Sequence, residues 1–334
     1  MKSSENIRRK YIILAVLFAI SVVSVFVCTG IGQMDFSFVE IIGALFRDDG
    51  STAGIIVWNL RLPRVLCCGL VGICLSLSGC ILQGVMGNKL ASPSTIGVTS
   101  GAAFVGYLIL AAFPAYTDFL PIGAIVGAFG TSMLIYLLAY QKGVSSAKII
   151  LSGMAVSAVF GALNDSIRTF FADSIGNVSG FLVGGFNGCT WDTFKMLLPY
   201  ALVGVGATLF LPYKMNILML GDESAASLGL RTESFRFILI CVSSLLAGSA
   251  VAAVGLVSFV GLIVPHIARL VIGADYRFLF PASAMLGFSL VAICDTVGRI
   301  IMPPGEIPVS IILSLIGAPF FLWLIRTREE RSDG

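Results

Sequence analysis

Apolar runs of about 20 residues recur along the whole chain, and they constrain its fold more than any other feature. A helix of that length crosses the ~30 Å hydrocarbon core of a bilayer. Because one water-soluble globule could not bury so many apolar runs, the sequence predicts an all-α polytopic membrane protein whose backbone is hydrogen-bonded within helices. The runs are Tyr11–Ile31, Leu62–Leu82, Thr95–Phe113, Leu120–Tyr140, Ile149–Phe171, Thr193–Tyr213, Phe235–Val254, Phe278–Ile300 and Ile307–Ile325.

A tenth stretch, Phe259–Ile272, is short and is interrupted by Pro265, His266 and Arg269. Both ends of the chain are basic, and basic residues favour the cytoplasmic side of a membrane. Ten crossings place both ends in the cytoplasm, whereas nine place them on opposite sides. We therefore expect ten transmembrane helices, cytoplasmic termini and a single membrane domain over residues 1–334. The first run has no small-residue cleavage site after it, so we expect it to be retained as a span.

Composition excludes several other classes of protein. Charged residues make up only 12% of the chain, whereas soluble domains average about 25%. This shortfall excludes a cytosolic enzyme, a disordered chain and a nucleic-acid-binding domain. The net charge of +3 is too small to indicate an anionic partner.

Small residues are interpreted as packing residues. The eight cysteines include no CxxC pair, and all but one lie within apolar runs, so neither a metal site nor a disulfide is expected. Glycine spacings such as Gly123–Gly127, and the face formed by Gly72, Ser76 and Gly79, predict helices that approach one another closely in lipid.

The chain lacks the motifs of an enzyme. One histidine excludes HExxH and every two-histidine metal site, and there is no GxSxG elbow and no GxxxxGK[ST] phosphate loop. We therefore expect no catalysis, no resident metal and no cofactor. Uphill transport would be driven by an ion gradient or by a separate ATPase subunit that binds ATP, and the residues leave both options open.

Few ionisable residues fall at membrane depth. Asp165 and Arg168 lie three apart, and Asp295 lies one turn before Arg299. An ion-coupled carrier would use such groups, but we interpret both pairs as structural ion pairs.

The longest expected cytoplasmic connection covers residues 214–231. Asp222 is expected to cap a short helix, Glu223 lies in its first turn, and Gly229 stands where a left-handed residue ends it. The helix contains acidic residues and no basic one, so docking into a protein groove is favoured over binding to anionic lipid.

The sequence Arg61-Leu62-Pro63-Arg64 opens the second run on the outer side. Two arginines oppose the helix dipole there, which favours anions at an N-terminus, so an external carboxylate partner is expected. The alternative is a pair of arginines that snorkel to the interface. Arg299 lies at an outer C-terminal end that the dipole already favours.

Several motifs together resemble those of permeases of ATP-driven (ABC) importers for iron-siderophore complexes, haem and vitamin B12, the type II importers. The resemblance runs in order from about residue 57 to 325. The motifs are Arg61–Arg64, Gly79–Gln83, Asn88–Pro93, Gly97–Ala102, Gly221–Gly229, Phe259–Arg269, Pro304–Pro308 and Gly317–Phe320.

The resemblance implies a ten-helix subunit in the cell membrane of a prokaryote. It implies a second permease chain, identical or homologous, two ATPase subunits, and an extracytoplasmic substrate-binding protein. By similarity to the vitamin B12 permease, binding-protein glutamates would dock on Arg61, Arg64 and Arg299. The segment that would couple to the ATPase comprises Gly221, Asp222, Glu223, Ser224, Ala225, Leu228 and Gly229.

The same resemblance implies a cytoplasmic gate made of Asn88, Leu90, Ser146 and Ala147. The chain departs from the family pattern at two places: Lys89 stands where proline is usual, and Ala147 replaces a hydroxyl residue. His266 lies in a matched motif, and we interpret it as a structural residue, not an iron ligand, because a chelate already fills the coordination sites of its metal.

The resemblance is specific for the family and not for the cargo. The expected function is therefore that of an importer permease for an iron-siderophore complex. Haem or a corrinoid is the alternative within the family. An ion-coupled secondary transporter is the alternative from another class, and a polytopic intramembrane enzyme is a more distant one.

Overall fold

The computed structural model describes residues 2–32, 43, 52–94, 97–139, 146–171 and 184–332, and all regular structure in these ranges is helical. Each expected apolar run forms a helix, and so does the shorter tenth stretch. The long helices are α1 (Lys2–Gly30), α4 (Leu62–Val85), α5 (Val98–Ala112), α6 (Leu120–Ala139), α7 (Ser146–Phe170), α10 (Trp191–Thr208), α13 (Thr232–Val254), α14 (Val260–Ile272), α15 (Tyr276–Ile300) and α16 (Val309–Ser332).

Shorter helices connect them: α3 (Thr52–Ile56), the π-helical turn η1 (Val57–Arg61), η2 (Pro114–Phe119), α11 (Pro212–Leu218) and α12 (Asp222–Ser227). Length and composition alone qualify 5 of the described helices as membrane spans, or 6 if the bent pair α10–α11 is one span. The remaining apolar helices, α14 among them, are shorter. They depend on their neighbours in the bundle to lie at membrane depth, so the count of ten crossings stays a prediction.

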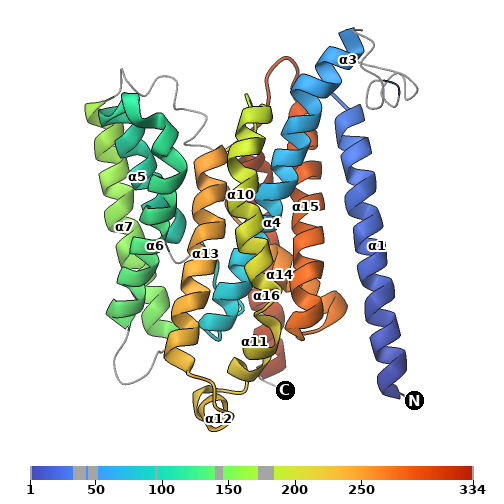
Figure 1. The fold of residues 1–334 in the computed structure, drawn as a ribbon, viewed down its shortest axis with the longest axis vertical. Helices are drawn as coiled ribbons and strands as arrows, with labels where there is room; N and C mark the ends of the chain where they lie inside the picture. The colour runs from blue at the N-terminus through green and yellow to red at the C-terminus, as the bar shows by residue number, and fades with distance from the viewer. Residues whose placement is uncertain are drawn as a thin grey trace.

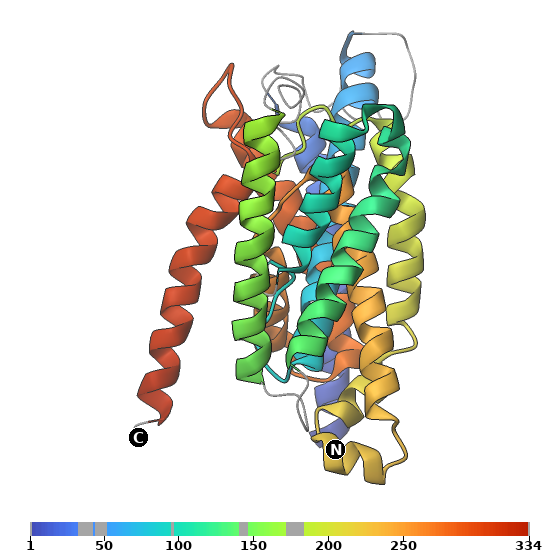
Figure 2. The same ribbon diagram turned by 90° about the vertical axis from the view of Figure 1, so that its left-hand side faces the viewer.

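The helices run side by side in one elongated bundle (Figure 1). Helix α1 begins and α16 ends at the same end of the bundle, and α12 protrudes there (Figures 1 and 2). An even number of crossings places the two termini in this way.

Helix α4 lies at the centre of the bundle and is almost entirely buried, whereas α1 packs along its outside against α15. Glycines allow the close approach of α4 to its neighbours. A side chain at Gly72 would collide with the carbonyl of Gly287 on α15, and one at Gly79 would collide with the carbonyl of Gly261 on α14. The close packing predicted for this face is confirmed.

One expected run is interrupted. Thr193–Tyr213 was expected as a continuous span, but α10 ends at Thr208 and α11 begins at Pro212, with a bend of 59° between them. Pro212 lacks the N–H that a continuing helix needs, and its ring would collide with the carbonyl four residues before it. Helix α11 therefore turns away from the axis of α10 before the chain reaches α12.

Candidate functional site

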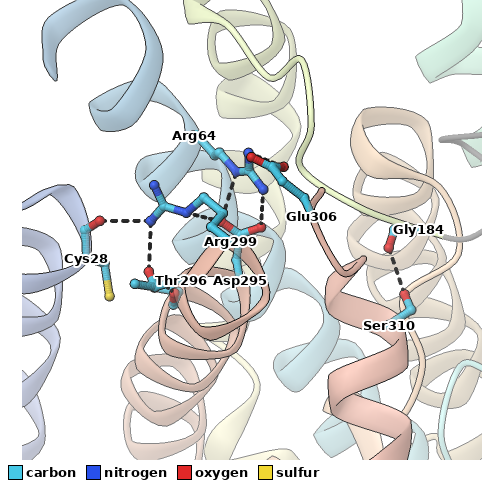
Figure 3. A network of polar contacts seen from close by, with 9 residues as sticks. Cys28, Arg64, Gly184, Asp295, Thr296, Arg299, Glu306 and Ser310 are labelled. Carbon is cyan, nitrogen blue, oxygen red and sulfur yellow. Dashed lines mark hydrogen bonds and ion pairs between the residues drawn. The ribbon is translucent and has the colours of Figure 1, made fainter. Parts of the chain in front are cut away.

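Two ends of the bundle carry the expected functional residues, and the end opposite α12 holds a network of charged side chains (Figure 3). Arg64 lies in the first turn of α4, which follows the π-helical turn η1 in the chain. Its Nε and Nη2 donate to the two carboxylate oxygens of Asp295 at 2.9 and 2.8 Å. Its Nη1 donates to Glu306 Oε2 at 2.9 Å. Arg64 is thus bound by two carboxylates of its own chain.

Arg299 and Arg61 extend this network to the C-terminal end of α1. Arg299 Nη2 donates to the carbonyl of Cys28 at 2.8 Å and to Thr296 Oγ1 at 2.9 Å. Arg61 Nη1 donates to the carbonyl of Gly30 at 2.8 Å. The last carbonyls of a helix have no partner within it and carry the negative end of its dipole, so the two arginines complete the end of α1.

An external carboxylate partner was expected for Arg64, and the structure shows two carboxylates of its own chain beside it. Asp295, 3% exposed, lies on α15, which packs against α4, and Glu306 lies in the segment after α15. The structural ion pair expected between Asp295 and Arg299 is confirmed, with 3.3 Å between Arg299 Nε and Asp295 Oδ2. For the other expected pair, the side chain of Arg168 lies outside the described residues.

A cavity of about 450 Å³ opens beside the network. Its charged lining consists of Arg61, Arg64, Arg299 and Glu306, and Asn187 and Thr190, in the segment before α10, add polar groups. Three guanidinium groups and the carboxylate of Glu306 line this cavity, and the carboxylate of Asp295 lies buried beside it. The role of Glu306 could not be assigned from sequence. Its one signal was its place in the motif Pro304–Pro308.

At the other end, α12 is the expected short helix, but its cap differs. Gly221, with φ +96°, stands at the N-cap, and Asp222 is the first helical residue and caps nothing. Gly229 adopts the expected left-handed conformation with φ +83°. The N–H groups of Gly229 and Leu230 donate to the carbonyls of Ala226 and Ala225 at 2.9 and 3.0 Å, which ends the helix.

Asp222 has another role: it makes a bidentate ion pair. Arg236 of α13 donates to its two carboxylate oxygens at 2.7 and 3.0 Å. Tyr136 of α6 donates to Glu233 in the first turn of α13 at 2.7 Å. Arg236 was not expected to have a role. The one feature of the sequence that could have indicated it is that a lone arginine stands at the start of an apolar run. Two polar contacts therefore join α12, α13 and α6.

The surface of α12 is divided between a buried and an exposed side. Ala225 is fully buried. Glu223, Ser224 and Leu228 are exposed, with Leu228 at 61%. An exposed leucine beside polar groups on a protruding helix is a surface that a protein groove can cover.

The expected gate residues are described only in part. Asn88 and Leu90 lie in the turn after α4, where Asn88 Oδ1 accepts a hydrogen bond from the Leu90 N–H at 2.9 Å. Lys89 is exposed between them. Ser146 and Ala147 form the start of α7, but their side chains lie outside the described residues. His266 packs edge-to-face on Phe320, with 5.9 Å between the ring centroids.

A model of the FecCD transport family matches residues 16–327. The chain belongs to the FecCD transport family. The match covers both ends of the bundle described above, from α1 into α16. This FecCD chain is therefore the permease subunit of an ABC importer, a multi-pass membrane protein of the bacterial type that catalyses no reaction itself.

Relatives agree with this assignment along nearly the whole length. The Fe(3+)-citrate import system permease protein YfmE of Bacillus subtilis (strain 168) is 36% identical over 331 residues, 99% of each chain. The hemin transport system permease protein HmuU of Yersinia pestis is 37% identical over 291 residues, 83% of this chain and 85% of its own. An inward-facing structure of a metal-chelate type ABC transporter matches with a TM-score of 0.83 at 31% identity, covering 94% of this FecCD chain and 99% of that one.

Proposed function

We propose that this chain forms the pathway through which an ATP-driven importer moves an iron-siderophore complex into the cell. The observation that carries the proposal is that one FecCD-family bundle has an arginine-lined cavity at one end and a protruding, ion-paired helix at the other. The first suits an anionic surface of a binding protein, and the second suits the groove of an ATPase. The full-length similarity to a Fe(3+)-citrate permease favours an iron chelate as cargo.

The proposed orientation places α12 and both termini in the cytoplasm, with ten spans. Arg8, Arg9 and Lys10 begin α1 at the same end as α12, and Lys214 lies on α11 close to it. Basic residues at that end satisfy the positive-inside rule.

On the cytoplasmic side, Glu223, Ser224 and Leu228 would enter a groove on one of the two ATPase subunits. The remaining residues of the coupling segment, Gly221, Asp222, Ala225 and Gly229, would hold α12 in position. A second permease chain, identical or homologous, would complete the pathway. Asn88, Leu90, Ser146 and Ala147 would close it towards the cytoplasm.

On the outer side, Arg61, Arg64 and Arg299 would receive glutamates of the binding protein. Because these arginines already bind carboxylates and carbonyls of their own chain, an incoming glutamate would share a guanidinium group and would not meet a bare charge. Affinity for the binding protein should fall as salt rises, since partly exposed charges are screened. An affinity that does not change between low and high salt would remove these arginines from the docking surface.

The test of the function uses proteoliposomes. The chain, reconstituted with its ATPase, its binding protein and ATP, should accumulate a ferric siderophore in preference to haem or cobalamin. The chain alone, with a proton or sodium gradient, should accumulate none. Uptake driven by the gradient alone would identify an ion-coupled secondary transporter, and preferential haem uptake would support the alternative cargo that the haemin permease similarity suggests.

A further inference from the structure

A second cavity lies nearer to the α12 end of the bundle, whereas the arginine network lies at the opposite end. It has a volume of about 410 Å³ and lies between the bent pair α10–α11 and the first three turns of α15, with Leu77 of α4 also lining it. Its walls are largely apolar. They include Val205 and Leu209 on one side and Phe280, Ala284 and Met285 on the other. We call this cavity the α11–α15 groove.

The shape of the groove follows from the 59° bend between α10 and α11. Asn216 of α11 keeps the two walls together: it donates to Asp275 Oδ1 at 2.9 Å and accepts from the N–H of Tyr276 at 3.1 Å. Both partners lie at the start of α15. Leu209, 73% exposed at the rim, shows that the groove opens on the outside of the bundle, where lipid surrounds a membrane protein.

The end of the groove nearest α12 is polar and basic. Arg277 and Tyr213 line it there, and the guanidinium carbon of Arg277 lies 5.7 Å from the centre of the Tyr213 ring. A second cation approaches from α1: Lys10 Nζ lies 4.9 Å from the centre of the Phe278 ring, and Arg277 lies 5.8 Å from the same ring. Two cations from different helices thus lie against the ring of Phe278.

Among the side chains that the structure describes, the charges at this corner do not cancel. Asp275 pairs with Arg277 at 2.6 Å, and the Arg277 and Asn216 hydrogen bonds hold the pKa of its carboxyl well below the usual range, so Asp275 offsets one positive charge. Lys10 supplies a second, and the exposed Arg8 and Arg9 precede it on α1. An apolar groove with a basic end is complementary to a phospholipid, which has apolar acyl chains and a negatively charged phosphate.

We propose that the α11–α15 groove binds one anionic phospholipid of the leaflet that faces α12. Its phosphate lies at Lys10 and Arg277, and one acyl chain lies along Phe280, Ala284 and Met285. This lipid links α1, α11 and α15, the last of which also carries Asp295 and Arg299 of the outer network. The groove shares no lining residue with the arginine-lined cavity or with α12.

The experiment is a lipid titration of the full-length chain in detergent, followed by native mass spectrometry. The probes are phosphatidylglycerol and phosphatidylcholine with identical acyl chains. The wild-type chain should bind one phosphatidylglycerol more tightly than phosphatidylcholine. Lys10→Gln should weaken phosphatidylglycerol binding about fivefold, as expected for one basic residue at a membrane surface, and should leave phosphatidylcholine binding unchanged. Lys10→Arg should retain the preference.

Ala284→Trp tests the apolar half of the site, because a large side chain there fills the groove and leaves the charges in place. It should weaken binding of both lipids at this site. Lys148→Gln is the matched control: Lys148 is exposed on α7, across the bundle from α1 and α15 (Figure 1), and its loss should change nothing. Size-exclusion profiles would show that each variant is folded.

Four results would overturn the proposal. Lys10→Gln could bind phosphatidylglycerol as the wild type does, or Lys148→Gln could weaken it equally, which would indicate attraction by overall charge. The headgroup alone, glycerophosphoglycerol, could compete as well as the intact lipid. A disulfide between two chains carrying Leu209→Cys would show that a second copy covers the groove.

Discussion

At the residue scale, the outer network depends on one carboxylate. Asp295 is bound by Arg64 through two hydrogen bonds and lies beside Arg299, and all three side chains are largely buried. Two guanidinium groups therefore share one buried negative charge. Burial makes this ion cluster expensive to disturb, because removal of Asp295 takes from Arg299 its carboxylate in a medium of low dielectric constant and leaves Arg64 with Glu306 alone.

Asp295→Asn should lower the free energy of unfolding by about 3–5 kcal/mol, the cost of leaving buried charges unpaired. Thermal unfolding in detergent measures this loss. Glu306→Gln is the matched control: Glu306 is 25% exposed and binds the same arginine, so it should cost less than about 1 kcal/mol. Equal losses from the two variants would mean that burial does not set the energy of this network.

The turn after α4 allows a second prediction about single residues. Lys89 is exposed, whereas Leu90 is half-buried and its N–H is held by Asn88. An unpaired ammonium group stays hydrated, since burying it would cost several kcal/mol. In a background without reactive cysteines, Lys89→Cys should react with an impermeant thiol reagent at similar rates with and without nucleotide. Leu90→Cys should react in one state only, and the reverse pattern would place the lysine in the gate.

At the scale of elements, α12 is held at both ends. Gly221 and Gly229 adopt positive φ values on either side of it, and the Asp222–Arg236 ion pair fixes it to α13. Tyr136 and Glu233 extend the connection to α6. In the proposed coupling, a displacement of α12 would therefore be passed to α13 and α6 through these contacts.

Gly229→Val should disturb the end of α12, because a β-branched residue in the left-handed conformation costs on the order of 1–2 kcal/mol. Stimulation of ATP hydrolysis by the binding protein should be lost, while the permease still inserts in the membrane. Ser227→Ala, an exposed change in the same helix, should leave stimulation intact. Normal stimulation in Gly229→Val would show that α12 does not transmit the signal.

The Arg236–Asp222 ion pair leads to a separate prediction. Arg236→Ala should uncouple ATP hydrolysis from transport by releasing α12 from α13, while binding-protein affinity stays unchanged. Its effect on the unfolding free energy should be smaller than that of Asp295→Asn, because Asp222 is 48% exposed and becomes hydrated. The charge exchange Asp222→Arg with Arg236→Asp should restore part of the coupling. If it restores none, another contact of Arg236 carries the effect.

At the scale of the whole molecule, the two ends of the bundle differ. Helix α12 and both termini lie at one end (Figures 1 and 2), and the arginine network lies at the other. Sidedness can be measured with impermeant thiol reagents in sealed vesicles. Ser227→Cys on α12 should react only from the cytoplasmic side. Tyr116→Cys, exposed on η2 where α5 joins α6 at the opposite end, should react only from outside. Labelling of both from one side would contradict the proposed orientation.

Sequence by itself determined the elements of this protein and its family. Apolar runs long enough to span a bilayer specify helices locally, because lipid forces each segment to satisfy its own backbone. Each expected run is helical, although Thr193–Tyr213 is divided between α10 and α11. The order of motifs from Arg61 to Phe320 was enough to indicate the family. The left-handed Gly229 was predictable as well, since a helix end is a local feature.

Tertiary structure decided the partners of the charged side chains. Arg64 and Asp295 are 231 positions apart in the chain, and their ion pair exists only because glycines let α4 and α15 approach closely. In the same way, Arg236 of α13 binds the carboxylate of Asp222, which was expected to cap α12. Pro212 begins a separate helix within a run that was expected to be continuous, and the resulting bend forms one wall of the α11–α15 groove. Helix formation is a short-range property of the chain, whereas the pairing of buried charges depends on which helices become neighbours.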